Sequence, residues 1–330
     1  MKTILVINAL NGVFPLVLQK KYPTAKITCA EIFPFYKHHL RNLGFEVVDW
    51  DDVMDMKFDI VVGNPPYQSD KRTGTQPLWP LFVHKCAQML TPTGHMAMIT
   101  PNKWCGHTTN VIKGDVHLYS QVFKNKLVSC NIQKCSDQFP SVGGYENCFS
   151  WFVIANSGSD QFTATTLNDQ HVVKAEWFDR LPLRSLNEIT HNILQKVKSP
   201  LSYEFKQVSS GFQNQNQGAV VISQAQRIHY RKLNTYWDKQ SNINPTSKSV
   251  VSQIVFPKSS QKKVHAVFGS ELFQFIYDIF WNGDNFGTKF YNSLPYLDLN
   301  KLWSNDSIYQ QFGLTSEEIK YIQKYLTDPN

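Results

Sequence analysis

The most specific chemical arrangement in this chain is four consecutive residues, Asn64, Pro65, Pro66 and Tyr67. They follow a largely apolar run, residues 58–62, that predicts a buried strand ended by Gly63. Because two prolines stiffen the loop, the Asn64 side-chain carbonyl and the Pro65 backbone carbonyl can accept both hydrogens of one exocyclic amine. Tyr67 can stack on the ring that carries this amine. Such an arrangement suits attack by a weakly nucleophilic aromatic amine on a sulfonium methyl group; the plainer interpretation is a proline-rich turn.

The elements that must position this loop follow from the pattern of the first ~150 residues, where short apolar runs alternate with helical spacing. This alternation predicts α/β units and a doubly wound, Rossmann-like sheet. Ligands of such sheets bind at the carboxyl ends of the strands, which is where residues 64–67 fall. We expect strands at residues 3–7, 26–31, 46–48, 58–62, 94–100, 127–132 and 149–155, and helices at 13–21, 35–43, 80–90 and 116–123.

The pattern changes after a polar break at residues 157–160. We therefore expect two domains, residues 1–157 and residues 158–330, with a mixed α+β organisation in the second. Helices are predicted there at residues 186–197, 270–280 and 316–325, with short alternating runs across 200–265.

The net charge of +7 is concentrated in one stretch of the second domain. Residues 196–263 contain 11 Lys and Arg against two acidic residues, together with aromatic and amide side chains. This composition suits phosphate contacts and hydrogen bonds to base edges, although a solvated basic face has the same composition. The candidate contacts are Arg227, Arg231, Lys232, Lys262 and Lys263.

Composition excludes several classes of protein. Hydrophobic residues make up 42% and charged residues 18%, which is typical of a globular chain and not of a disordered one. No apolar run reaches the ~18–20 residues that span a bilayer. The six cysteines form no CxxC pair, so we expect neither a disulfide framework nor a metal site, and a cytoplasmic location.

At residues 64–67 the chain resembles the N6-adenine DNA methyltransferases, with the motif order of their γ group and of restriction-modification methylases. The resemblance is strongest over residues 46–106, where residues 78–82 (LWPLF) and 98–104 (MITPNKW) follow. It implies a Rossmann-like domain that uses S-adenosylmethionine, followed by a target-recognition domain. The implied activity is site-specific methylation of a flipped adenine in double-stranded DNA, by a bacterial or phage-encoded enzyme.

The resemblance also implies individual roles. Glu31, next to Ile32, would bind the ribose hydroxyls of the cofactor, Asp49 its adenine amine, and Trp50 its adenine ring. Further cofactor contacts are implied for Asn64 and for the first-loop residues Asn8, Ala9 and Gly12. Phe139 would pack on the flipped base opposite Tyr67, and Lys103 and Trp104 would line the DNA cleft.

Two features depart from the family pattern. The first loop, residues 8–14, keeps one glycine, and Asn8 stands where an acid is common. The first strand is predicted to begin at about Thr3, so the usual leading segment is expected to be missing. Other residues or a partner chain would then complete the cofactor pocket, or the cofactor would bind poorly. Two alternatives stay open: a DNA-binding subunit or decoy with a degenerate methyltransferase fold, and a protein-glutamine or RNA methyltransferase.

Overall fold

The computed structural model describes two compact units, Met1–Trp104 with Thr109–Arg180, and Leu181–Asn330 with Cys105–Thr108. Within them it describes residues 1–67, 77–105, 111–112, 116–132, 149–166, 170–204, 206–208, 219–222, 235–237, 251–255, 261–280 and 288–327.

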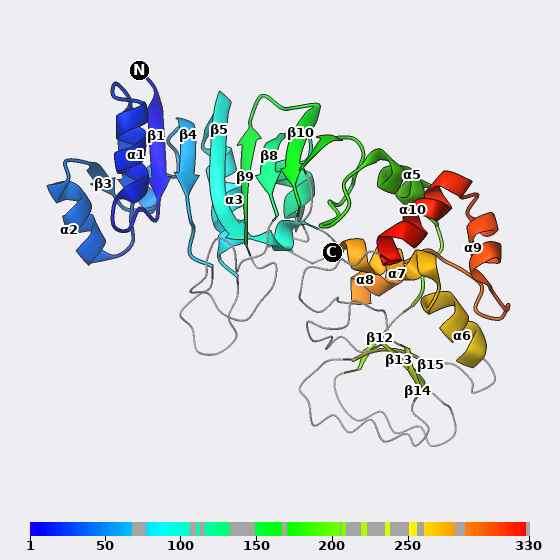
Figure 1. Ribbon diagram of the computed structural model, residues 1–330. Helices are drawn as coiled ribbons and strands as arrows, with labels where there is room; N and C mark the ends of the chain where they lie inside the picture. The colour runs from blue at the N-terminus through cyan, green and yellow to red at the C-terminus, as the bar shows by residue number, and fades with distance from the viewer. Residues whose placement is uncertain are drawn as a thin grey trace. The chain divides into compact units, whose positions relative to one another are not determined.

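The first unit is built around a nine-stranded sheet in the order β11-β10-β8-β9-β5-β4-β1-β2-β3 (Figure 1). The five strands from β3 to β5 run parallel, β9 is antiparallel to both its neighbours, and β10 returns parallel to β8. The strands are β1 (Thr3–Ile7), β2 (Lys26–Ala30), β3 (Glu46–Val48), β4 (Phe58–Gly63), β5 (Leu90–Pro101), β8 (Leu127–Asn131), β9 (Phe149–Ala155), β10 (Gln161–Thr165) and β11 (Gln170–Lys174).

This order confirms the predicted α/β class and doubly wound sheet. The strand order reverses at β1, with β2 on one side and β4 on the other, so β1 and β4 flank a topological switch point. Strands β1 and β2 are almost wholly buried, with Ile4, Leu5 and Val6 of β1 fully excluded from solvent. Burial on both faces explains why these strands have continuous apolar runs instead of alternating ones.

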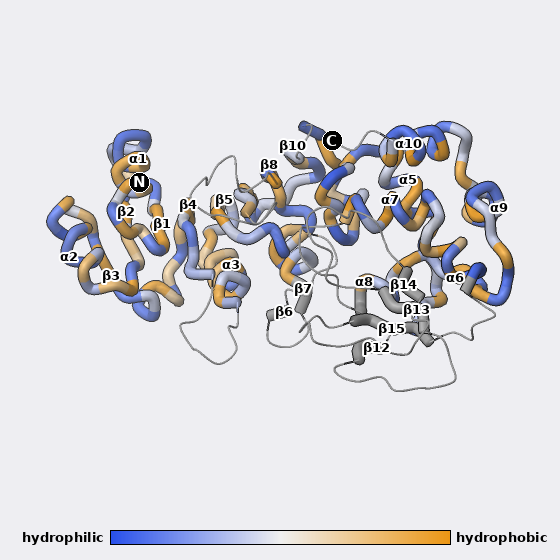
Figure 2. Tube along the Cα trace, turned by 60° about the horizontal axis from the view of Figure 1, so that its bottom comes forward, coloured by the Kyte–Doolittle hydropathy of each residue, from blue (hydrophilic) through white to orange (hydrophobic). Residues whose placement is uncertain are grey.

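Helices cover the sheet from both sides. Figure 1 shows α1 (Val13–Lys21) and α3 (Trp79–Gln88) on opposite faces, as right-handed crossovers between parallel strands require. Helix α2 (Pro34–Asn42) packs on β3 and shows apolar and polar stretches in Figure 2. Two short 3₁₀ turns follow β3 and β5, at Asp51–Val53 and Asn102–Trp104.

One predicted helix was wrong. The spacing of residues 116–123 predicted a single α-helix, whereas the structure has a short strand followed by a π-helical turn at Tyr119–Phe123. The turn is held against the sheet by large apolar side chains, since Phe123 stacks on Trp104 with ring centroids 4.5 Å apart. The small hairpin here is β6 (Val111–Ile112) with β7 (Val116–His117).

The units divide later than the predicted boundary at residue 157. Strands β10 and β11 continue the sheet of the first unit beyond that point. β10 pairs with β8 across Thr163–Ser129 to Thr165–Asn131, so its backbone hydrogen bonds belong to the nine-stranded sheet. The contact boundary lies between Arg180 and Leu181.

The second unit has a helical core centred on α7, a helix buried along most of its length. Side chains from the other helices surround it, and in Figure 2 α10 carries both apolar and polar stretches along its length. The predicted helices at 186–197, 270–280 and 316–325 are confirmed. The helices are α5 (Glu188–Lys196), α6 (Gln261–Phe268), α7 (Glu271–Phe280), α8 (Thr288–Asn292), α9 (Asn305–Gln311) and α10 (Ser316–Thr327).

The basic stretch contributes a four-stranded antiparallel sheet in the order β12-β15-β13-β14. With the helices, this sheet gives the second unit the mixed α+β character expected from the sequence. The strands are β12 (Lys206–Val208), β13 (Ala219–Ile222), β14 (Thr235–Trp237) and β15 (Val251–Val255).

Candidate functional site

Sheet register aligns the predicted site residues in one row. The last paired residues of β3, β2, β1 and β4 are Val48, Ala30, Ile7 and Gly63, joined through Ala30–Val48, Ile7–Ala30 and Ile7–Gly63. The next residue of each chain segment is therefore Asp49, Glu31, Asn8 and Asn64, in that order across the carboxyl edge. At about 4.8 Å per strand this row spans roughly 14 Å, enough for a ligand with two distinct ends.

The loop after β1 has an unusual backbone. Asn8, Leu10 and Gly12 all adopt left-handed conformations, with φ of 53°, 48° and 84°. Gly12 needs this freedom, because its N–H closes a turn on the Ala9 carbonyl at 2.9 Å and its own carbonyl starts helix α1. Ala9 is buried, and its side chain packs in the core beneath the loop; its predicted contact with the cofactor stays a prediction. The loop thus turns tightly without the usual run of glycines.

Glu31 holds this loop in place. Its carboxylate accepts backbone N–H groups from Leu10 at 2.9 Å, Ile32 at 2.8 Å and Phe33 at 3.1 Å, and its side chain is fully buried. A carboxylate has about four acceptor positions, so three are already used. Its predicted bond to ribose hydroxyls stays a prediction; the contacts in the structure are to the protein's own backbone.

The loop after β4 is fixed at both ends. Asn8 donates its side-chain amide to the Asn64 backbone carbonyl at 2.6 Å, and the Leu78 N–H donates to the Tyr67 carbonyl at 3.0 Å. Pro65 is buried between these anchors. The Asn64 side-chain oxygen is also buried, and within the described part of the chain no donor reaches it. A buried acceptor left without a donor is what a ligand amine requires.

Tyr67 packs against an aromatic residue that the sequence did not single out. The rings of Tyr67 and Phe149 lie 5.2 Å apart between centroids, at 35° to one another. Phe149 begins β9 and pairs with Pro101 at the end of β5, so the antiparallel strand brings it to the same edge. Phe139, the predicted partner of Tyr67, lies outside the described residues. The sequence signal that could have identified Phe149 was an aromatic residue at the first position of the predicted strand 149–155.

The adenine-side candidates lie at the β3 end of the row. Trp50 packs on Phe82 of α3, with ring centroids 4.7 Å apart, and is half-buried. The Asp49 carboxylate is exposed and forms an ion pair with Lys37. Ile32 is half exposed next to Glu31, so its side chain is available to a ligand.

The two residues at the end of β5 differ in environment. Lys103 is exposed, whereas Trp104 is fully buried and donates its indole N–H to Ser150 at 2.8 Å. The expectation that Trp104 also lines a DNA cleft is therefore wrong. Three further predicted contacts, Arg227, Arg231 and Lys232, lie outside the described residues. Lys262 is exposed on α6, and Lys263 donates to the Asn300 carbonyl at 2.7 Å.

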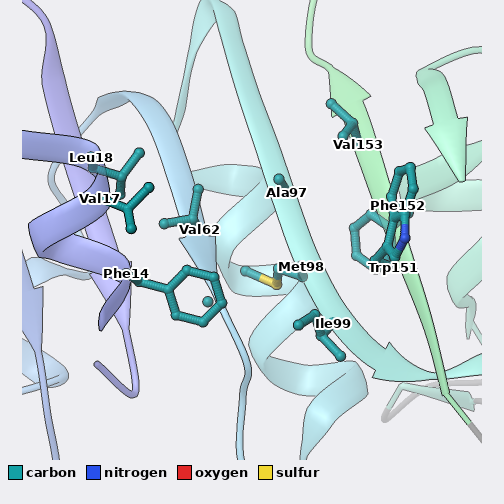
Figure 3. A pocket seen from close by; sticks show the side chains of 11 residues that line it. Phe14, Val17, Leu18, Val62, Ala97, Met98, Ile99, Trp151, Phe152 and Val153 are labelled. Carbon is teal, nitrogen blue, oxygen red and sulfur yellow. The ribbon is translucent and has the colours of Figure 1, made fainter. Parts of the chain in front are cut away.

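An apolar pocket of about 260 Å³ adjoins the row. Figure 3 shows Phe14, Val17 and Leu18 of α1 on one side and Trp151 of β9 on the other. Its floor reaches Gly63, the residue that precedes the Asn64 loop. The pocket offers apolar surface beside the site but few groups for hydrogen bonding.

Two negative findings concern the part of the chain that the structure describes. It contains no group of three His, Cys, Asp or Glu side chains placed to hold a metal ion. It also contains no helix with the length and hydropathy needed to cross a membrane.

One family model matches part of the first unit. Residues 18–114 match the model of the Eco57I restriction-modification methylase family. The matched segment runs from α1 to the residues after β5 and includes Glu31, Asp49 and the Asn64–Tyr67 loop. No curated protein matches the chain.

Several solved structures are similar in fold. A protein from Listeria monocytogenes described as a class I S-adenosylmethionine-dependent methyltransferase is 12% identical, with a TM-score of 0.35 over 51% of this chain and 61% of that one. A predicted O-methyltransferase from Agrobacterium tumefaciens is 13% identical, with a TM-score of 0.33 over 50% and 80%. A TehB-like methyltransferase from Corynebacterium glutamicum is 14% identical, with a TM-score of 0.30 over 46% and 79%. This chain thus spans less than two thirds of the length of the Listeria protein.

Proposed function

We propose that this chain is a DNA adenine-N6 methyltransferase that uses S-adenosylmethionine. The proposal rests chiefly on one observation, the buried Asn64 side-chain oxygen that no described donor reaches, held on a doubly anchored Pro-Pro loop. The match of residues 18–114 to a restriction-modification methylase family supports methyl transfer and points to DNA.

The acceptors act on the target amine. The Asn64 side-chain oxygen and the Pro65 carbonyl oxygen each accept a hydrogen bond from one of its two N–H groups. The nitrogen lone pair is then directed at the methyl donor. These bonds strengthen as the amine nitrogen becomes positive, so they favour the transition state over the bound substrate. Tyr67 and Phe149 supply aromatic faces for an extruded base, whose unstacking costs a few kcal/mol.

The residues of the row fit the cofactor in most positions. Trp50 with Phe82 offers an apolar surface for the adenine ring, and Asp49 an exposed acceptor for its amine. Ile32 is available for apolar contact, and one acceptor position of Glu31 is left for a ribose hydroxyl. S-adenosylmethionine would supply an electrophilic methyl group on a sulfonium centre: the carbon–sulfur bond would break as the carbon–nitrogen bond forms, S-adenosylhomocysteine would leave, and the amine would release one proton.

The test compares classes of methyl acceptor. The protein is incubated with S-adenosylmethionine carrying a labelled methyl group and, separately, with mixed-sequence double-stranded DNA, RNA and a protein extract. We expect label in DNA alone. Label in RNA or protein would establish the corresponding alternative methyltransferase.

A second candidate function is a DNA-binding subunit with a methyltransferase fold and no cofactor. The observation that favours it is Glu31, whose buried carboxylate is already engaged by three backbone N–H groups. Calorimetric titration with S-adenosylmethionine, with and without DNA, separates the two functions. Heat of binding in either experiment supports the enzyme, and its absence in both supports the subunit.

A further inference from the structure

The catalytic loop takes its anchor from the first loop of the sheet. Asn8 and Asn64 each follow a paired residue, Ile7 or Gly63, so register brings them side by side. The Asn8 side-chain amide donates to the Asn64 carbonyl at 2.6 Å, and the Asn8 backbone N–H donates to Ala30 at 3.0 Å. Asn8 has a φ of 53°, a conformation that asparagine tolerates better than most residues.

The Asn64 carbonyl is a special point in this loop. Because residues 65 and 66 are prolines, the two peptide groups that follow Asn64 have no N–H. Each can be held by a hydrogen bond only through its carbonyl. The Pro65 carbonyl must stay available to the substrate amine, so the Asn64 carbonyl is the nearest group that the protein itself can hold. The Leu78 N–H fixes the other end through Tyr67.

We propose that Asn8 is a positioning residue: its side-chain amide holds the Asn64 carbonyl and thereby orients the acceptor pair toward the target amine. The inference rests on the proposed function. The contact requires a hydrogen-bond donor at residue 8. In Asn8→Asp, a carboxylate of the same shape would instead place negative charge against the Asn64 carbonyl oxygen.

The diagnostic variant is Asn8→Asp, with Asn8→Ala as a control that has no donor at any pH. At pH 8 both should lose about 100-fold in kcat, because misplacing catalytic groups by ~1 Å costs this much, while KM for S-adenosylmethionine changes little. A free Asp side chain has a pKa of about 3.9, and an adjacent carbonyl oxygen raises the pKa of this carboxyl by favouring its neutral form. As the pH falls to 5, the protonated carboxyl donates again, so Asn8→Asp should recover at least about tenfold relative to Asn8→Ala.

Other titratable groups face the same loops. Glu31 accepts the Leu10 N–H, His39 contacts the Asn11 carbonyl at 3.2 Å, and Tyr67 ends the catalytic loop. Their effects are present in the wild type and in Asn8→Ala. The relevant quantity is therefore the kcat of Asn8→Asp divided by the kcat of the wild type, or of Asn8→Ala, at the same pH.

A spectroscopic measurement makes the test independent of turnover. The chain has two Asn–Pro pairs, Asn64–Pro65 and Asn244–Pro245. Labelling asparagine with ¹³C at the carbonyl and proline with ¹⁵N therefore gives two linked signals, and the second is an internal control. We expect Asn8→Asp to shift the Asn64 signal at pH 8 and to restore it at pH 5, with the Asn244 signal unchanged.

Two results would overturn the inference. One is an Asn64 carbonyl signal that does not respond to either variant. The other is a rise in KM for S-adenosylmethionine with unchanged kcat, which would make Asn8 a cofactor contact instead. If the signal responds as expected but the wild type methylates no acceptor, the anchor stands and the proposed function fails.

Discussion

The Asn64 side-chain oxygen is buried and has no hydrogen-bond donor among the described residues, and this combination has an energetic consequence. A buried polar atom without a partner costs about 1–3 kcal/mol of stability, and removing the Asn64 side chain would relieve this cost. Asn64→Ala should therefore be at least as stable as the wild type. Its kcat should fall about 100-fold or more, by analogy with the loss of one preorganised hydrogen bond in other active sites. Chemical denaturation and steady-state kinetics on the same preparation test both parts.

Tyr67 and Phe149 make a second prediction at this scale. If their rings hold the extruded base, Tyr67→Ala should lose about 1–3 kcal/mol of stacking, which is roughly 5- to 150-fold in kcat/KM for DNA. Tyr67→Phe keeps the ring and should retain most of the activity. Equal losses in the two variants would assign the role to the hydroxyl group and contradict the stacking account.

The strands around the site depend on close backbone approach at Gly63. A Cβ there would lie 2.3 Å from Ile7 Cγ1 and 2.4 Å from the Ile7 carbonyl oxygen, so β1 and β4 would have to separate. Gly63→Ala should cost about 2–3 kcal/mol, measured by denaturant unfolding. Gly44→Ala is the matched control: Gly44 has a φ of 87°, but a Cβ added there would meet no atom within 4 Å, so only backbone strain of about 1–2 kcal/mol is expected.

Asp59 ties the amino ends of the same strands and makes stability depend on pH. The Thr3 backbone N–H donates to its carboxylate at 2.9 Å and lowers its pKa, and the Thr3 and Thr91 hydroxyls add bonds at 3.2 Å. A depressed pKa stabilises the folded state above the unfolded pKa of about 3.9, and this contribution is lost as the pH falls through the folded pKa. Asp59→Asn should lose less stability than the wild type between pH 5 and pH 2. If the free energy of unfolding falls by the same amount in the wild type and in Asp59→Asn over this pH range, the prediction is contradicted.

Most elements near the site could be predicted because local pattern and tertiary structure agree there. Residues 3–7 and 149–155 are strands with the predicted bounds, since long β-branched and aromatic runs have no competing structure. The row of Asp49, Glu31, Asn8 and Asn64 could not be predicted, because it depends on strand order and register. Phe149 was missed for the same reason: its position depends on the antiparallel insertion of β9 beside β5.

The whole molecule divides at Arg180 and not near residue 157, because the polar break at 157–160 is a turn between β9 and β10. A turn that ends a strand and a linker that ends a domain have the same composition. The predicted role of the second unit in DNA recognition, and the predicted partner chain, stay predictions; nothing in the described residues supports the partner chain.

DNA binding by the basic stretch is tested by salt dependence. Each phosphate contact contributes about −0.9 to the log–log slope of affinity against salt. Lys262 is exposed, so Lys262→Ala should flatten the slope by about 0.9 if the residue contacts phosphate. Lys263 donates to the Asn300 carbonyl, so Lys263→Ala should change the slope less. If neither variant changes the slope, α6 lies outside the DNA interface.

The central claim is that the Asn64 loop directs methyl transfer to the N6 amine of adenine in DNA. The most direct measurement is nucleoside mass analysis of mixed-sequence DNA after incubation with S-adenosylmethionine and either the wild type or Asn64→Ala. We predict N6-methyladenine with the wild type and at least about 100-fold less of it with the variant. N4-methylcytosine as the product, or equal N6-methyladenine from both proteins, would contradict the account.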